Sequence, residues 1–270
     1  MARRLSVELY AIGTEVVYGL TLDTNTHELA QEIVRLGGDV RRITQLHDEL
    51  PTLVEAFRES IQRGAQVVVS TGGLGPTDDD ITAAALAELA GVPLEPNEEV
   101  ACDFAQRLGL NSPAELRWNF ARMARLPRGA RPLRNTVGWA PGIHLSVEGT
   151  DFFALPGPPR EMRHVFAEHV APWMLERGAG KTAHARFLVD IPYESQLVPY
   201  LQATADRFPQ AYLKPRLADK RREGWLTVDL LVADEDESAA RRRLRAVLAD
   251  LQEQLEAKGH RLELLDQTPS

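Results

Sequence analysis

The sequence has little cysteine, no long apolar run and no lysine in its first 180 residues. Cys102 is the single cysteine among 270 residues, which excludes an internal disulfide framework and fits a reducing compartment. No uninterrupted apolar stretch is long enough to cross a bilayer, and residues 1–5 lead into a strand pattern without the apolar segment of a signal peptide. We therefore expect a cytoplasmic protein without a membrane partner.

The missing lysines exclude several kinds of site. Residues 1–180 contain 17 arginines and no lysine, against 24 Asp and Glu. A Walker lysine, a Schiff-base lysine and a lysine general base are therefore excluded from this part. Residues 181–270 hold 14 Lys and Arg against 15 Asp and Glu. Neither part has the basic excess that binding to a phosphate backbone requires, so we expect no nucleic-acid partner.

The first 90 residues alternate between strand and helix patterns. Strands are expected at residues 5–12, 40–46 and 65–70, and each is followed by a segment with helical spacing of apolar residues, at 24–36, 51–62 and 80–90. The third strand contains Val67-Val68-Val69, a continuous apolar run typical of the middle of a parallel sheet. This order predicts an open, mostly parallel α/β sheet flanked by helices.

The rest of the chain predicts a second domain. Helices are expected at 98–108, 113–124 and 160–175, an irregular segment at 127–142, and strands at 143–147 and 151–155. Residues 176–182 are polar and glycine-rich, which is typical of a linker. We therefore predict an α/β domain at 1–175, a linker at 176–182 and a small α/β domain at 183–270, whose expected strands are 186–191, 211–217, 225–232 and 261–264 and whose helices are 193–207 and 235–256.

A glycine-rich segment follows the most apolar strand. Residues 71–82 read Thr-Gly-Gly-Leu-Gly-Pro-Thr-Asp-Asp-Asp-Ile-Thr and precede a predicted helix, where open α/β sheets place their ligands. Glycines let backbone amides approach an anion, and a helix N-terminus adds unpaired N–H groups. The segment matches neither the Walker spacing nor Gly-x-Gly-x-x-Gly. We predict that the amides of Gly72 and Gly73 hold a phosphate, with Thr71, Gly75 and Thr77 as further ligand contacts.

The three aspartates after this turn are unexpected beside a phosphate. Asp78, Asp79 and Asp80 are compatible with an anion if one caps the following helix and others hold a cation that bridges to the phosphate. The alternative is a purely structural turn with capping acids.

Further candidates follow other strand ends. Glu15 lies in Gly13-Thr14-Glu15 after the first strand, and Asp48 follows the second strand, at the sheet edge expected for Asp80. Asp48 and Asp80 are therefore candidate catalytic residues that share a metal ion or position a water, Glu15 is a further candidate metal ligand, and Asn25 is a candidate ligand contact. Without the glycine-rich segment, the residues around Glu15 and Asn25 would be interpreted as turn and cap.

A rigid turn precedes the helix expected at 160–175. It reads Pro156-Gly157-Pro158-Pro159-Arg160-Glu161. Pro158 and Arg160 are candidate ligand contacts, since an arginine can pair with a phosphate or a ribose. A simple chain reversal is the alternative.

Several of these motifs together resemble the CinA-like family. These are competence- and damage-inducible proteins whose N-terminal part has the fold of the molybdopterin-binding MoaB and MogA proteins. The resemblance covers residues 5–175 and extends weakly to 183–258, which match the small KH-like domain of that family. Besides the segments at 13–15, 71–82 and 156–159, it is carried by Asn25, Asp48, Asn119 and Gly138-x-Ala140-Pro141-Gly142.

The resemblance implies a ligand site at the Thr-Gly-Gly turn and a set of activities. CinA-like domains are associated with metal-dependent hydrolysis of nucleotide pyrophosphates such as ADP-ribose. MogA-like relatives bind and adenylylate molybdopterin, with aspartates that match Asp48 and Asp80. A divalent ion (Mg or Co), with a monovalent ion such as K as a further candidate, a nucleotide or pterin ligand and a homodimer are therefore expected.

Three departures from the family leave alternatives open. The family's Asn-x-x-Gln-Ala is Asn-Phe-Ala-Arg-Met at residues 119–123, Thr136 replaces a proline, and Arg160 replaces Ser or Glu. We therefore expect a pyrophosphatase, and two alternatives stay open. One is a module that binds or adenylylates molybdopterin, and the other is a non-catalytic binding protein. The nicotinamide mononucleotide deamidase domain of many CinA proteins has no match here, so a separate deamidase is a candidate partner.

Overall fold

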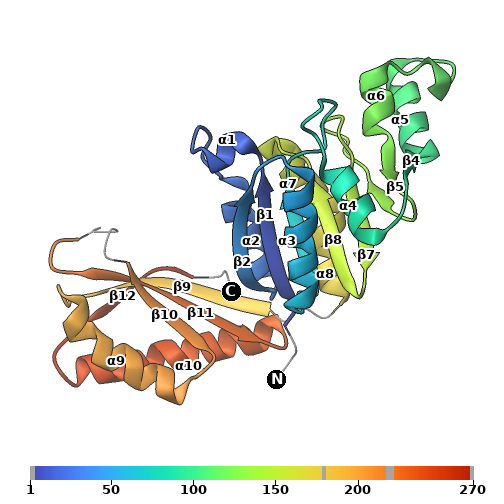
Figure 1. The fold of residues 1–270 in the computed structure, drawn as a ribbon. Helices are drawn as coiled ribbons and strands as arrows, with labels where there is room; N and C mark the ends of the chain where they lie inside the picture. The colour runs from blue at the N-terminus through green and yellow to red at the C-terminus, as the bar shows by residue number, and fades with distance from the viewer. Residues whose placement is uncertain (1–3, 178–180, 217–221, 268–270) are drawn as a thin grey trace. The chain divides into compact units, whose positions relative to one another are not determined.

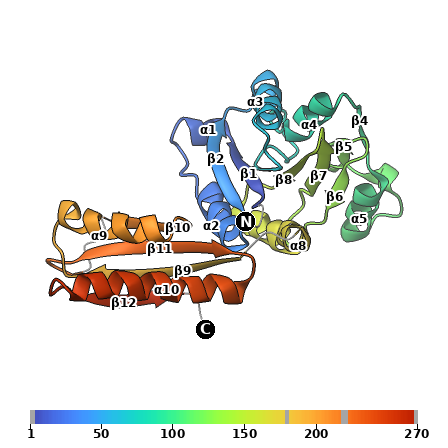
Figure 2. The ribbon, with the colours of Figure 1, turned by 90° about the horizontal axis from the view of Figure 1, so that it is seen from below.

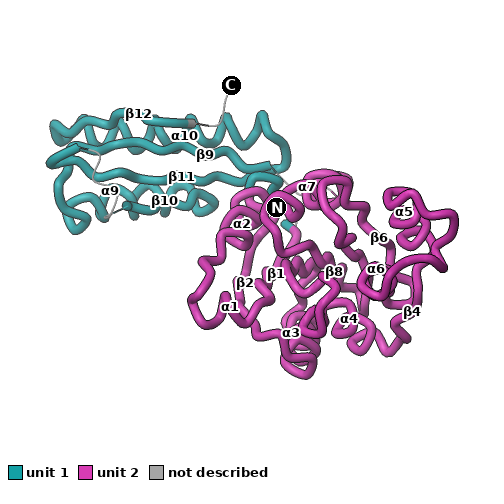
Figure 3. Tube along the Cα trace, turned by 90° about the horizontal axis from the view of Figure 1, so that it is seen from above, with its two compact units in different colours: residues 1–4, 35–37, 179–270 teal, residues 5–34, 38–178 magenta. Residues whose placement is uncertain are grey.

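A computed structural model describes residues 4–177, 181–216 and 222–267 (Figure 1). The chain divides into two compact units, residues 5–34 and 38–178 in the larger and 1–4, 35–37 and 179–270 in the smaller (Figure 3). Helix α8 ends at Glu176 and strand β9 begins at Lys181. Residues 178–180 of the predicted linker lie outside the described residues, so the linker stays a prediction.

The larger unit is built on a six-stranded sheet. Its strand order is β2-β1-β3-β8-β7-β6, in which β2, β1, β3 and β8 are parallel and β7 is antiparallel to both its neighbours. This confirms the mostly parallel sheet. The strands are β1 (Ser6–Ile12), β2 (Asp39–Leu46), β3 (Val67–Thr71), β6 (Arg131–Leu133), β7 (Gly142–Val147) and β8 (Thr150–Leu155).

Helices cover both faces of this sheet. Figure 2 shows α3 and α4 on one face and α2 and α8 on the other. Every residue of β3 is buried, as expected for a strand covered on both faces. On one face, the Phe57 ring lies 5.5 Å from the rings of Tyr10 and of Phe152. The helices are α2 (Asn25–Arg35), α3 (Leu50–Gln62), α4 (Thr82–Ala90), α7 (Pro159–Val165) and α8 (Ala171–Glu176).

Three sequence predictions in this unit need correction. The helix expected at 113–124 is interrupted, because Leu116 and Arg117 have extended backbones between the 3-10 turn η1 (Pro113–Glu115) and α6 (Trp118–Met123). A π-helical segment, η2 (Phe166–Val170), joins α7 to α8. The region expected to be irregular contains β6, and β4 (Leu94–Pro96) pairs with β5 (Arg125–Pro127). Three-residue strands are too short to show alternation. Helix α5 (Glu98–Leu108) has the predicted bounds.

The smaller unit is the predicted small α/β domain. Its antiparallel sheet has the order β10-β11-β9-β12, and α9 and α10 cover one face (Figure 1). The buried residues between helices and sheet include Phe187, Val228 and Leu251. Residue 217 of the predicted strand 211–217 lies outside the described residues. The elements are β9 (Lys181–Val189), α9 (Glu194–Arg207), β10 (Ala211–Arg216), β11 (Leu226–Asp234), α10 (Glu237–Glu256) and β12 (Leu262–Gln267). Across the described ranges, no helix is long and apolar enough to cross a bilayer.

A buried ion pair ties β1 to α3. Glu8 is 3% exposed and accepts hydrogen bonds from Arg63 Nε (2.9 Å) and Nη2 (2.7 Å) and from Ser60 Oγ (2.8 Å). Burial alone would raise the pKa of Glu8, but the bonds from Arg63 and Ser60 and the charge of Arg63 outweigh it and lower that pKa below 4.5.

We predict that Glu8→Gln lowers the free energy of unfolding at pH 7 by about 2 to 3 kcal/mol, since hydrogen bonds to a charged group are lost. A lowered folded-state pKa stabilises the fold above pH 4.5 and ceases to do so as the pH falls through it. The difference between wild type and variant should therefore shrink below pH 4.5. Urea unfolding at pH 7 and in acid measures it.

Glu59→Gln is the matched control. Glu59 also pairs with Arg63, at 2.8 Å, but its side chain is 55% exposed. An exposed ion pair contributes about 0 to 1 kcal/mol, so this variant should remain close to wild type. Equal losses in the two variants would contradict a stabilising role for the buried carboxylate.

Candidate functional site

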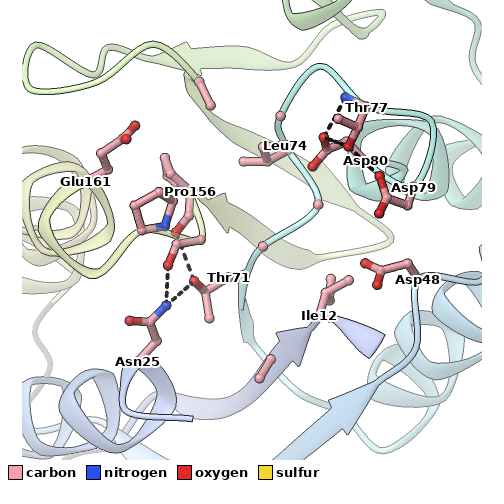
Figure 4. A pocket seen from close by; sticks show the side chains of 18 of the residues that line it. Ile12, Asn25, Asp48, Thr71, Leu74, Thr77, Asp79, Asp80, Pro156 and Glu161 are labelled. Carbon is pink, nitrogen blue, oxygen red and sulfur yellow. Dashed lines mark hydrogen bonds between the residues drawn. The ribbon is translucent and has the colours of Figure 1, made fainter. Parts of the chain in front are cut away.

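A cavity of about 610 Å³ lies at the carboxyl ends of the parallel strands. Its walls come from the segments that follow β1, β2, β3 and β8, together with α6 and the loop before β7 (Figure 4). Of the residues predicted for the site, all but Arg160 line this cavity: Glu15, Asn25, Asp48, Thr71, Gly72, Gly73, Gly75, Thr77, Asp80 and Pro158. Arg160 is exposed on the first turn of α7.

The glycine turn, residues 71–76, is held tightly against its surroundings. Gly72 and Gly73 have φ of 104° and 67°. A Cβ on Gly72 would overlap the carbonyl oxygen of Ile12, and one on Gly73 would overlap Oγ1 of Thr82. The buried Thr82 hydroxyl donates to the Gly72 carbonyl at 2.8 Å, and the Thr82 amide donates to the Gly73 carbonyl at 3.0 Å. The turn is thereby fixed to the first residue of α4.

The amides of the turn differ in availability. The Gly72 amide donates to the carbonyl of Leu155 at 3.0 Å, so the prediction that this amide holds a phosphate is wrong, although Gly72 lines the cavity. In the described ranges, the amides of Gly73, Leu74 and Gly75 donate to no protein group. Successive free amides in a turn form a concavity suited to an anion. Anion binding would therefore use residues 73–75.

Asp79 and Asp80, which follow the turn, accept hydrogen bonds from Thr77 and do not cap helix α4. Helix α4 begins at Thr82, and no side chain bonds its N-terminus, so the predicted helix cap is wrong. Asp80 Oδ2 instead accepts from the amide (2.8 Å) and hydroxyl (2.7 Å) of Thr77. A hydrogen bond from Thr77 also lowers the pKa of Asp79. Asp78 points away to pair with Arg122 at 2.9 Å.

Glu15 lies in α1 (Thr14–Val17), a helix of one turn where only a turn was expected, and Asp48 bonds to the first residue of that helix. Asp48 Oδ2 accepts from the Thr14 amide at 2.7 Å. The Glu15 carboxylate lies against Gly13, where an added Cβ would come within 2.7 Å of Oε1. No group of three His, Cys, Asp or Glu in the described part of the chain is close enough to hold a metal ion. The three predicted ligands thus share a cavity without forming a ready-made cage.

Asn25 and Thr71 hold the cavity wall together. The Asn25 amide donates to Thr71 Oγ1 (3.0 Å) and to the carbonyl of Gly157 (2.7 Å), and Thr71 Oγ1 donates to the carbonyl of Pro156 (2.9 Å). Figure 4 shows these bonds at the base of the cavity. They connect α2, β3 and the turn before α7, so both side chains position the wall. Among the described residues, the buried Oδ1 of Asn25 has no hydrogen-bond partner, so Asn25 stays a candidate ligand contact.

Sequence reasoning missed part of the lining. Glu161, Trp139 and Phe120 line the cavity, and Glu161 lies across it from Asp48 and Asp80 (Figure 4). Trp139 occupies the variable position of the Gly138-x-Ala140 motif. Glu161 is the last residue of the turn segment 156–161, in which the sequence predicts only Pro158 and Arg160 as ligand contacts. Motif matching fixes the small residues of a loop but gives no indication of which large side chain turns inward.

The charge of the lining is one-sided. Among the described residues that line the cavity, six are Asp or Glu and none is Lys, Arg or His. The acidic members are Glu15, Asp23, Asp48, Asp79, Asp80 and Glu161. An anion bound at the free amides would meet this negative charge unless a cation accompanied it.

Comparison with known proteins defines the class of this chain. Residues 8–176 match the family described as "Probable molybdopterin binding domain", which covers the larger unit and its cavity. The chain belongs to this family.

Its relatives confirm the CinA-like assignment. It is similar to the protein CinA of Thermoplasma acidophilum, with 31% identity and a TM-score of 0.58 over 63% of this chain and 98% of that one. A protein of Sulfurisphaera tokodaii is 32% identical over 91% of this chain and 93% of its own length. A protein of Pyrococcus horikoshii is 39% identical over 74% of this chain and 80% of its own. The predicted MoaB/MogA-like fold class is thereby confirmed.

We predict that Gly72→Ala distorts the turn and destabilises the protein by about 2 kcal/mol more than Gly64→Ala. Both glycines have positive φ, but a Cβ on Gly64 meets open space whereas one on Gly72 overlaps backbone. The left-handed conformation alone costs an alanine about 1 to 2 kcal/mol, and the control isolates that cost. Urea unfolding of the two variants measures the difference, and equal destabilisation would contradict the close packing of the turn.

Proposed function

We propose that the cavity binds a phosphate-bearing nucleotide or pterin together with a divalent cation, and that the chain hydrolyses a nucleotide pyrophosphate such as ADP-ribose. The observation that carries the proposal is the pairing of free amides at residues 73–75 with a lining that has six carboxylates and no base. Amides favour an anion, and the carboxylates favour a cation. A phosphate with its metal ion satisfies both.

The donor set fits a magnesium-type ion. Such ions take oxygen ligands and commonly bind through one or two carboxylates plus substrate phosphates, so no cage of three protein ligands is required. Asp48, Asp80 and Glu15 are the candidate holders. When bound, a divalent cation would polarise the bridging phosphate and lower the pKa of an attacking water. Magnesium or cobalt is proposed, and an additional monovalent ion such as potassium stays a prediction.

The chain's own groups then have separate roles. The amides of Gly73 and Gly75 hold phosphate oxygens, and their fixed position costs no reorganisation when charge develops there. Asp48 Oδ2 is occupied by the Thr14 amide, which leaves Oδ1 to accept a hydrogen bond or a proton from water. Water adds across the P–O–P bridge of ADP-ribose, and the products are AMP and ribose 5-phosphate.

Family membership favours a second candidate function, which is the binding of a pterin. The matched family is described as molybdopterin-binding, which supports a pterin carrying a phosphate as the ligand of the same amides. In that case the chain would bind or adenylylate the pterin, or bind it without chemistry. The expected homodimer and the separate deamidase partner also stay predictions.

We predict that Asp80→Asn abolishes magnesium- or cobalt-dependent hydrolysis of ADP-ribose, with a fall of at least about 100-fold in rate, because a charged ligand at the reacting phosphate is lost. Asparagine keeps an oxygen that can accept from Thr77, so the turn should persist. Release of AMP, followed by chromatography, measures the rate.

Asp78→Asn is the matched control, since Asp78 is only two residues away, fully exposed and outside the cavity. It should hydrolyse ADP-ribose at the wild-type rate. Wild-type protein that binds a pterin but releases no AMP would favour the second candidate. Full activity in Asp80→Asn would contradict both the cation and the site.

A further inference from the structure

Glu161 is a carboxylate that lies apart from Asp48, Asp79 and Asp80 in the cavity. It projects from the first turn of α7, across the cavity from Asp48, Asp79 and Asp80 (Figure 4). The glycine turn and its acids serve the phosphate end of a ligand. Glu161 therefore faces whatever the phosphate carries.

A buried asparagine fixes this carboxylate. Asn135 is 2% exposed, and its Oδ1 accepts from the amides of Val137 (3.2 Å) and Gly138 (3.0 Å). Its Nδ2 therefore has to donate, and it does so to the Ala140 carbonyl (2.9 Å) and to Glu161 Oε2. Asn135 cannot turn over without losing both amide bonds. In the part of the chain that is described, Oε1 of Glu161 has no partner.

The loop before β7 is shaped around the carboxylate. A Cβ on Gly138 would overlap Glu161 Oε2, so glycine provides the room that Glu161 occupies. Arg107 donates to the carbonyls of Asn135 (3.2 Å) and Gly138 and holds the loop from behind. Glu161 is thus held by a rigid frame, which is what a recognition group requires.

Flat aromatic side chains line the same cavity. Trp139, from the same loop, and Phe120, from α6, both line the cavity, and their ring centres are 4.8 Å apart. The guanidinium carbon of Arg107 lies 4.1 Å from the centre of the Trp139 ring and fixes the indole. Such a wall suits a planar heterocycle.

We propose that Glu161 determines ligand specificity by accepting a hydrogen bond from the exocyclic amino group of a planar nitrogen heterocycle. Adenine and pterin share this amino group. An ionised carboxylate only accepts hydrogen bonds, so it rejects an analogue that presents a carbonyl oxygen at the same position. The inference rests on the proposed function, because the heterocycle is placed by the phosphate that the glycine turn binds.

Two pairs of probes test the preference, each differing in one amino group. Calorimetric titration of the full chain with magnesium compares ADP with IDP, and the phosphate ester of 6-hydroxymethylpterin with that of 6-hydroxymethyllumazine. In at least one pair the amino compound should bind about 10-fold more tightly, since a hydrogen bond to a charged group is at stake. A preference confined to the first pair identifies a nucleotide ligand, and one confined to the second identifies a pterin.

Glu161→Gln tests the residue itself. Because the Asn135 amide is fixed, the glutamine has to turn its oxygen toward Asn135 and its NH₂ toward the cavity. The variant thus presents a donor where the wild type presents an acceptor, and the preference should vanish or reverse. Glu161→Asp, which withdraws the carboxylate by one methylene, provides a second variant if the glutamine protein does not fold. Glu168→Gln, an exposed change of the same charge, should keep the preference.

The outcomes separate this inference from the proposed function. Equal binding within both pairs by the wild type, or an unchanged preference in folded Glu161→Gln, would overturn the role of Glu161 while magnesium-dependent binding stands. No magnesium-dependent binding of any of the four probes would overturn the proposed function itself. Asp80→Asn should weaken ADP and IDP by the same factor, because it acts at the phosphate end.

Discussion

The close approach of the glycine turn to its neighbours is the constraint on which the site depends. Gly72 lies against the carbonyl of Ile12, its amide bonds to Leu155, and Thr82 binds the carbonyls of Gly72 and Gly73. The hydroxyl of Thr71, the amide of Gly72 and the carbonyls of Gly72 and Gly73 therefore make bonds to the surrounding structure. The three following amides are left for a ligand, and their position is fixed by the sheet.

The second constraint is electrostatic. Carboxylates from the segments after β1, β2 and β3 meet the same cavity as those amides, and no basic side chain of the described lining offsets them. The negative charge of this lining opposes the binding of an anion unless a cation binds with it. The cavity lining continues with Trp139, Phe120 and Glu161. The proposed nucleotide or pterin, with its phosphate bound to a metal ion and its heterocycle at Glu161, would match these three parts in order.

Much of the fold follows from the sequence because its signals are local. The runs at 5–12 and 65–70 and the helical spacing at 24–36 and 51–62 predicted the parallel sheet. The three-residue strands β4, β5 and β6 were missed, since hydrogen bonding to a partner strand, not a local sequence pattern, makes them strands. The break at Leu116 was missed because apolar spacing continues across it.

The sequence predicts where the site lies in the fold but not the hydrogen bonds within it. That Asp48 and Asp80 reach one cavity follows from parallel strands ending at one edge. Several hydrogen bonds of the site depend on tertiary contacts that no local sequence pattern encodes. They are the bonds from Gly72 to Leu155, from Thr77 to Asp80 and from Asn25 to Gly157. Glu161 shows the same limit, since in the described part of the chain it is oriented by Asn135 and Gly138, which lie some 25 residues earlier in the sequence.

The amide NMR signals of Gly73, Leu74 and Gly75 report most directly on the central claim. With magnesium present, titration with inorganic pyrophosphate should shift these three signals and leave that of Gly72 nearly unchanged, because its N–H is already bonded to Leu155. Without magnesium the shifts should be absent. Three signals that stay in place, or shifts that are the same without the metal ion, would contradict the account.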